Sequence, residues 1–154
     1  MGQRFSEVWK REAGENRKRD KLRRITVDFK EVWTLRELGR HFVFEMFGCD
    51  RKALNDLRAI EDAMEKGAVD AGATIIGKVF HKFAPQGITG VVIIAESHLS
   101  IHTWPELGYA ALDIFTCNTA TDPMKAYRRI TRLLKPKSSS IMELKRGLLT
   151  EGKD

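Results

Sequence analysis

Apolar residues recur along this chain at the spacings of strands and helices. Strand-like runs, in which apolar residues alternate with polar ones or form a short buried stretch, occupy five segments. These predicted strands are residues 39–47, 74–83, 89–95, 109–117 and 141–144. Residues 97–102 follow the most apolar of these runs, and we expect them to turn and pair back with it.

Two further segments carry apolar residues three or four positions apart, which predicts amphipathic helices. The first is expected to begin after Asp50, a good N-cap residue, and to end near residue 71. The second is capped by Thr121 or Asp122 and stops at Lys135. Helices and an antiparallel sheet together give an α+β fold, a two-layer sandwich with two main helices on one face. The other face needs solvent-tolerant side chains or a partner subunit.

Positive charge is concentrated near the N-terminus. The 154 residues carry a net charge of +6, and residues 1–35, with ten Lys or Arg and six Asp or Glu, hold +4 of it. We therefore divide the chain into a basic N-terminal extension, residues 1–35, and a core domain, residues 36–154. A basic arm can bind nucleic acid or an acidic partner, but interspersed acids are more typical of a solvated helix.

Composition disfavours other classes of protein. The longest apolar run is far shorter than the roughly 20 residues of a membrane span. The first residues lack the apolar core of a secretion signal, and two cysteines are too few for a disulfide scaffold. We expect Cys49 and Cys117 to be free thiols of a cytoplasmic protein, with Cys49 in a structural role.

The densest chemistry lies in residues 95–106, which follow the apolar run Gly90–Ala95. A solvated hairpin tip would explain these polar residues without any function. His98 and His102 lie four apart, as a metal-binding pair on a helix would, but their neighbours favour a strand, so no metal site is predicted. A Ser–His hydrolase would need an orienting acid and a Gly-x-Ser-x-Gly turn, and that turn is missing.

A different reaction fits a serine that follows a buried strand. The Ser97 hydroxyl can attack the carbonyl of Glu96 and turn the amide into an ester, which is favoured by a strained bond. A base that removes the Ser97 α-hydrogen then eliminates the ester, and the resulting dehydroalanine becomes an imine, which water hydrolyses to a pyruvoyl group with loss of ammonia. His102 is the candidate base, provided that Ser97 lies on a turn and His102 on the returning strand.

Three motifs carry a resemblance to a known family: AESHLSIHTWPE at residues 95–106, FHKFAPQG at residues 80–87 and DIFTC at residues 113–117. From Leu38 to Gly147 the chain resembles the short, self-processing prokaryotic S-adenosylmethionine decarboxylases, which are pyruvoyl-dependent. The resemblance implies an enzyme that decarboxylates S-adenosylmethionine to the aminopropyl donor for spermidine and other polyamines. Its cofactor would be a covalent pyruvoyl group derived from Ser97.

The resemblance also implies roles for single residues. Glu96 and Ser97 resemble the two sides of the self-cleaved bond, and His102 resembles the processing base. Thr89 stands where relatives often carry a serine that helps processing, and its hydroxyl can do the same work. Cys117 resembles the residue that donates a proton to the substrate after decarboxylation.

For the substrate, Phe83 resembles the residue stacked on adenine and Glu106 the acid that binds the ribose hydroxyls. The expected assembly is a homodimer of cleaved protomers with its sites near the interface. One alternative is the same machinery acting on arginine or another amino acid, but such a substrate offers no nucleoside to these two residues. The other is a nucleic-acid- or partner-binding protein that uses the basic arm, against which the intact Glu96–Ser97 pair and Cys117 argue.

Overall fold

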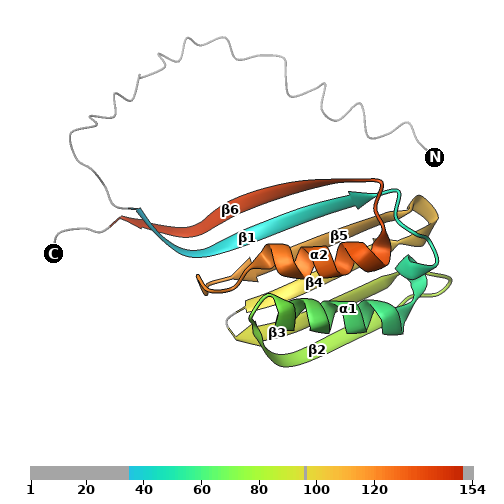
Figure 1. Cartoon of the computed structure of the whole chain (residues 1–154), viewed down its shortest axis with the longest axis horizontal. Helices are drawn as coiled ribbons and strands as arrows, with labels where there is room; N and C mark the ends of the chain where they lie inside the picture. The colour runs from blue at the N-terminus through green and yellow to red at the C-terminus, as the bar shows by residue number, and fades with distance from the viewer. Residues whose placement is uncertain (1–34, 96, 151–154) are drawn as a thin grey trace, which may run out of the picture. The chain divides into compact units, whose positions relative to one another are not determined.

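The computed structural model describes residues 35–95 and 97–150, which form one antiparallel sheet covered on one face by two helices (Figure 1). The strands are β1 (Leu35–Phe47), β2 (Thr74–Lys82), β3 (Ile88–Ala95), β4 (Ser97–Trp104), β5 (Tyr109–Thr116) and β6 (Ser138–Thr150). Their order across the sheet is β2-β3-β4-β5-β1-β6. The helices are α1 (Leu57–Asp70) and α2 (Pro123–Leu134), with short 3-10 turns at Ala53–Asn55 and Pro105–Leu107. The predicted α+β two-layer sandwich is thus confirmed.

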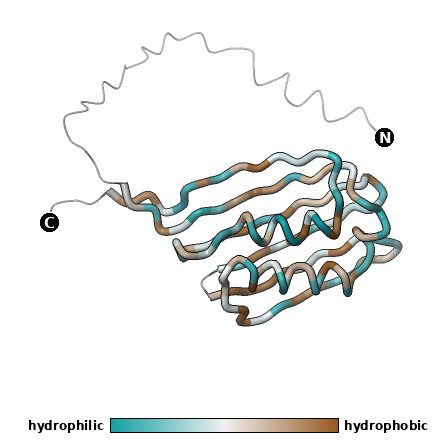
Figure 2. The backbone as a smooth tube through the Cα atoms, viewed as in Figure 1, coloured by the Kyte–Doolittle hydropathy of each residue, from teal (hydrophilic) through white to brown (hydrophobic). Residues whose placement is uncertain are grey.

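The core lies between the sheet and the helices. In β3, β4 and β5 every second side chain is buried on this side, among them Val92, Leu99 and Leu112. Each helix contributes one buried stripe, such as Ile60 and Met64 of α1, and Figure 2 shows the helices alternating between hydrophilic and hydrophobic colours. The remaining side chains of the strands point to the opposite side, which we call the open face.

Several bounds differ from the predictions, and the first strand begins at Leu35 rather than at residue 39. The first helix begins at Leu57, and Asp56 is its N-cap, because its carboxylate accepts a hydrogen bond from the Ala59 N–H at 3.1 Å. Asp50 instead accepts from the backbone of the preceding 3-10 turn. The last strand extends far beyond the predicted residues 141–144, because β6 pairs with β1 along almost its whole length. The second helix begins as predicted, with Asp122 as its cap.

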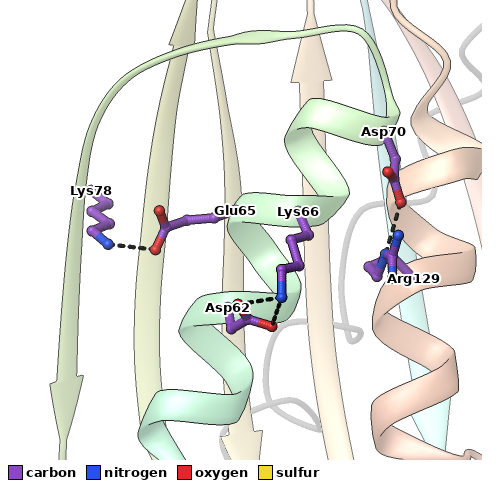
Figure 3. Close-up of polar contacts among 6 residues, drawn as sticks. All are labelled: Asp62, Glu65, Lys66, Asp70, Lys78 and Arg129. Atoms are coloured by element: carbon purple, nitrogen blue, oxygen red, sulfur yellow. Dashed lines mark hydrogen bonds and ion pairs between the residues drawn. The ribbon is translucent and has the colours of Figure 1, made fainter.

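Exposed ion pairs tie the helices to their neighbours (Figure 3). Arg129 of α2 contacts Asp70 of α1 at 2.8 Å, and Lys78 of β2 contacts Glu61 and Glu65 of α1. Such pairs on a protein surface each contribute about 0–1 kcal/mol, so buried apolar contacts dominate the attachment of the helices.

The predicted basic extension falls almost wholly on residues 1–34, which lie outside the described residues, and β1 begins at Leu35. No helix among residues 35–95 and 97–150 is long and apolar enough to cross a membrane.

Replacing the N-cap of α1 should destabilise the fold. Asp56→Ala leaves the Ala59 N–H without its acceptor, and we expect the free energy of unfolding to fall by about 1 kcal/mol. The matched control is Asp62→Ala, which removes an exposed pair with Lys66 in the same helix and should cost less than about 0.5 kcal/mol. Urea denaturation measures both. Equal losses for the two variants would contradict the role of Asp56 as the cap.

Candidate active site

Ser97 occupies an unusual backbone conformation at the first position of β4. Its φ is +148°, a region that side chains other than glycine rarely adopt and that costs about 1–3 kcal/mol. It pairs with Ile94 of β3 and Thr116 of β5, so it sits at the turn between two central strands. Glu96 lies outside the described residues. The backbone of Ser97 is therefore strained next to the bond at which the sequence predicts cleavage.

The backbone of Ser97 also brings it close to the next side chain. Neighbouring residues of a strand normally point to opposite faces. Here the Ser97 Oγ lies 3.5 Å from Nδ1 of His98, whose ring stands edge-on to Phe115 at 6.1 Å on the open face. The sequence names His98 as part of a possible metal pair with His102, but its contact with Ser97 could not be read from strand alternation.

Cys117 lies at the same end of the sheet as Ser97. It directly follows Thr116, the register partner of Ser97, and its thiol is free and exposed. Gly39 of β1 provides space for it. A Cβ at position 39 would come within 3.1 Å of the Cys117 Sγ and 2.8 Å of the Phe115 ring.

The other predicted residues gather at the opposite end of β4. The Thr89 hydroxyl and Nδ1 of His102 are 3.0 Å apart on adjacent strands of the open face. Glu106, in the turn after β4, accepts a hydrogen bond from the Gln86 side chain at 3.1 Å. Phe83, half exposed, closes the β2–β3 hairpin through its N–H to the Gly87 carbonyl.

A cleft of about 550 Å³ opens at this end of the sheet. It is lined by Arg51, Lys52, Asn55, Gln86, Pro105 and Glu106. Cationic and amide groups thus surround the Glu106 carboxylate, which suits a ligand with several hydroxyl or polar groups.

The length of β4 separates the two groups of predicted residues. Ser97 and His102 are five residues apart on one strand, a distance of about 16 Å at 3.3 Å per residue. His102 therefore does not reach the Ser97 α-hydrogen within one chain. The same spacing puts His98 and His102 about 13 Å apart, too far for a shared metal ion.

Polar side chains along the open face also contact one another. Asp113 accepts a hydrogen bond from Ser100 at 3.3 Å, and His41 contacts Arg146 at 3.2 Å. The Tyr109 hydroxyl donates to a carboxylate of β1, and burial, reinforced by that carboxylate, raises the pKa of Tyr109 to about 12. Asp113 and Tyr109 thus have hydrogen-bond partners within the chain, whereas Nε2 of His41 is buried without one.

Cys49 is buried beside the turn that follows β4, where its N–H donates to the Gly108 carbonyl at 2.8 Å. Its side chain is 6% exposed, and its thiol donates to the Met46 carbonyl at 3.6 Å. Burial raises the pKa of the Cys49 thiol, which keeps it protonated and unreactive. This environment agrees with the structural role expected from the sequence.

Comparisons with known proteins agree on one family. The sequence model of the S-adenosylmethionine decarboxylase family matches residues 40–147. The chain is 52% identical over 114 residues to the S-adenosylmethionine decarboxylase proenzyme of Caldicellulosiruptor saccharolyticus, a match that covers 74% of this chain and 92% of that protein. The proenzyme of Thermotoga maritima is 48% identical over 117 residues, which cover 76% of this chain and 90% of that one.

Solved structures share the fold. The adenosylmethionine decarboxylase of Aquifex aeolicus superposes with a TM-score of 0.68 at 37% identity, and the match covers 77% of this chain and 98% of that one. An AdoMetDC monomer of Trypanosoma brucei, at 19% identity and a TM-score of 0.51, shows the likeness of fold alone, over 66% of this chain and 44% of that one. By its sequence, across more than half of its length, this chain belongs to the S-adenosylmethionine decarboxylase family.

Proposed function

We propose that this chain cuts itself between Glu96 and Ser97 and then decarboxylates S-adenosylmethionine to the aminopropyl donor of polyamine synthesis. The observation that carries the proposal is the strained backbone of Ser97, which begins a central strand of the sheet. The relatives are named proenzymes, which fits activation by cleavage. Release of backbone strain favours the attack of the Ser97 hydroxyl on the preceding carbonyl.

A pyruvoyl group derived from Ser97 fits this position. Residue 97 lies in a turn between β3 and β4, so that a new chain end can form there without removing a residue from the core. When present, the group supplies a ketone that condenses with the substrate amine and accepts the electrons released with carbon dioxide. Cys117, at the same end of the sheet, is suited to deliver a proton to the substrate α-carbon.

The opposite end of β4 is suited to hold the rest of the substrate. The half-exposed Phe83 ring offers a surface for adenine, and the Glu106 carboxylate, beside the cleft, offers an acceptor for ribose hydroxyls. This arrangement favours a nucleoside-containing substrate over arginine or another free amino acid.

We further propose that the reactive centre is shared by two copies of the chain. Ser97 and Cys117 lie at one end of the open face, whereas Thr89, His102 and Glu106 lie at the other. If two open faces stack with their β4 strands antiparallel, the Ser97 of one copy meets the His102 of its partner. A single chain leaves about 16 Å between these two residues.

The open face is suited to such contact. In a single chain, it exposes several large apolar side chains to solvent. These are Phe47, Val79, Ile93, Trp104, Met142 and Leu144. Exposed apolar surface of this kind marks an interaction site. Asp113 and Tyr109 already have hydrogen-bond partners within the chain. Burying these polar groups in an interface therefore costs less free energy than burying unpaired ones.

Mass spectrometry and labelled substrate test the activity together. The purified chain should consist of residues 1–96 and a fragment beginning at position 97 that lacks a free amine. It should release carbon dioxide from carboxyl-labelled S-adenosylmethionine. Ser97→Ala should remain one uncut, inactive chain, because it has no hydroxyl to attack. Cys117→Ser should still cut itself but lose most decarboxylation, because a hydroxyl is a weaker acid than a thiol.

Cleavage of the Ser97→Ala chain would refute self-processing at this bond. A cut but inactive wild-type chain would instead point to another substrate. Carboxyl-labelled arginine provides the matched assay for that alternative.

Gly39→Ala tests the placement of the thiol. The added methyl would press against the Phe115 ring and the Thr116 carbonyl and displace Cys117. We expect decarboxylation to fall about tenfold or more, since a shift of about 1 Å near reacting groups has large effects on rate. Gly77→Ala is the control, because its new Cβ meets only an ordinary contact at 3.9 Å. Equal activity of the two variants would contradict this placement.

A further inference from the structure

We propose that His98 is the base that starts self-cleavage. It would take the proton of the Ser97 hydroxyl and pass it to the nitrogen that leaves the preceding carbonyl. The inference rests on the proposed function and adds a residue to it. It assigns the two histidines of residues 97–104 to two different steps.

The contact between Ser97 and His98 depends on the strained backbone. In a regular strand these neighbours would point to opposite faces. With φ at +148°, the backbone of Ser97 departs from a regular strand, and its Oγ lies 3.5 Å from Nδ1 of His98. The imidazole of His98 therefore lies beside the nucleophile at the residue whose backbone is strained.

The His98 ring is held in this position by its neighbours. It lies between Ile93 of β3 and Phe115 of β5 in the register of the sheet. The ring stands edge-on to Phe115 at 6.1 Å, and the Arg146 guanidinium covers the same phenyl ring at 5.3 Å. A half-buried ring fixed in this way needs little rearrangement to accept a proton.

His102 is not available for this step. Its Nδ1 is 3.0 Å from the Thr89 hydroxyl, and it lies about 16 Å from Ser97 along β4. In the proposed dimer a partner chain brings its own His102 to Ser97, but the Nδ1 of that residue is engaged by Thr89, whereas His98 of the same chain already lies beside the hydroxyl. The hydroxyl proton and the α-hydrogen thus go to different bases.

The proposed step is an exchange of one bond for another. Nδ1 of His98, in the tautomer that carries its proton on Nε2, accepts the Ser97 hydroxyl proton while Oγ bonds to the Glu96 carbonyl carbon. The bond from that carbon to the Ser97 nitrogen then breaks, and Nδ1 returns the proton to the nitrogen. The products are an ester and an amine, with no gain or loss of atoms or electrons. The 3.5 Å contact must shorten toward the 2.7–2.8 Å of a good hydroxyl hydrogen bond.

The test is the time course of cutting in freshly translated full-length chain. His98→Phe keeps an aromatic ring against Phe115 but has no nitrogen. We expect it to cut at least about 100-fold more slowly, the usual contribution of a general base, and to accumulate no ester. Hydroxylamine, which cleaves esters but not amides, should therefore leave the uncut chain intact. The control His81→Phe, on the same face, should cut at the wild-type rate.

His102→Ala serves as the reference for a chain that is blocked at the later step, the removal of the Ser97 α-hydrogen. Because its acyl shift is unaffected, it should accumulate an ester that hydroxylamine cleaves. A His98→Phe chain that cuts at the wild-type rate would overturn the inference, and so would one that accumulates the same ester. Failure of the wild-type chain to cut would instead overturn the proposed function as a whole, and the inference with it.

Chemical rescue separates a catalytic from a structural role. His98→Gly leaves a space beside Ser97, and added imidazole should restore at least part of the cutting rate, rising with imidazole concentration. A merely misfolded chain would not respond, and circular dichroism checks the fold of each variant. Absence of rescue in a chain that is folded would contradict the role of His98 as a base.

Discussion

Strand alternation in the centre of the sheet is the constraint on which the rest of the structure depends. Along β3, β4 and β5, one set of side chains is buried against the helices, and this set builds the core. The other set is thereby fixed on the open face, where it includes Thr89, His98 and His102. Ser97 is the exception, because its positive φ turns its hydroxyl toward the open face. The core and the reactive groups are therefore positioned by the same hydrogen-bonded ladder.

The length of β4 then determines how the site can be assembled. Its two ends carry complementary halves of the expected chemistry, a cleavable serine at one end and a Thr89–His102 pair at the other. A rigid strand cannot fold back to join them; in the proposed dimer, a second copy of the chain brings them together. The apolar side chains of the open face and its internally paired polar groups are compatible with that contact.

Much of the fold could be predicted from the sequence, because the spacing of apolar residues along each strand and helix reflects which side chains are buried. The start of α1 could not be predicted, since Asp50 and Asp56 are both good N-cap residues. The 3-10 turn between them makes Asp56 the N-cap of the helix. The length of β6 could not be predicted, because its exposed residues show no alternation of apolar and polar side chains. Its extent depends instead on hydrogen bonds to β1. The candidate residues could be named from motifs, but their division between two ends depends on strand geometry. The approach of His98 to Ser97 depends on a backbone angle that serine rarely adopts.

The shared reactive centre is tested most directly by co-expressing two defective chains that carry different tags. A Ser97→Ala chain retains His102 but has no hydroxyl, and a His102→Ala chain retains Ser97 but has no base. Each alone should stay uncut. In mixed dimers, one centre combines the intact Ser97 with the intact His102, so about half of the His102→Ala chains should be cut after random pairing. A mixture in which both chains stay uncut would contradict the shared centre.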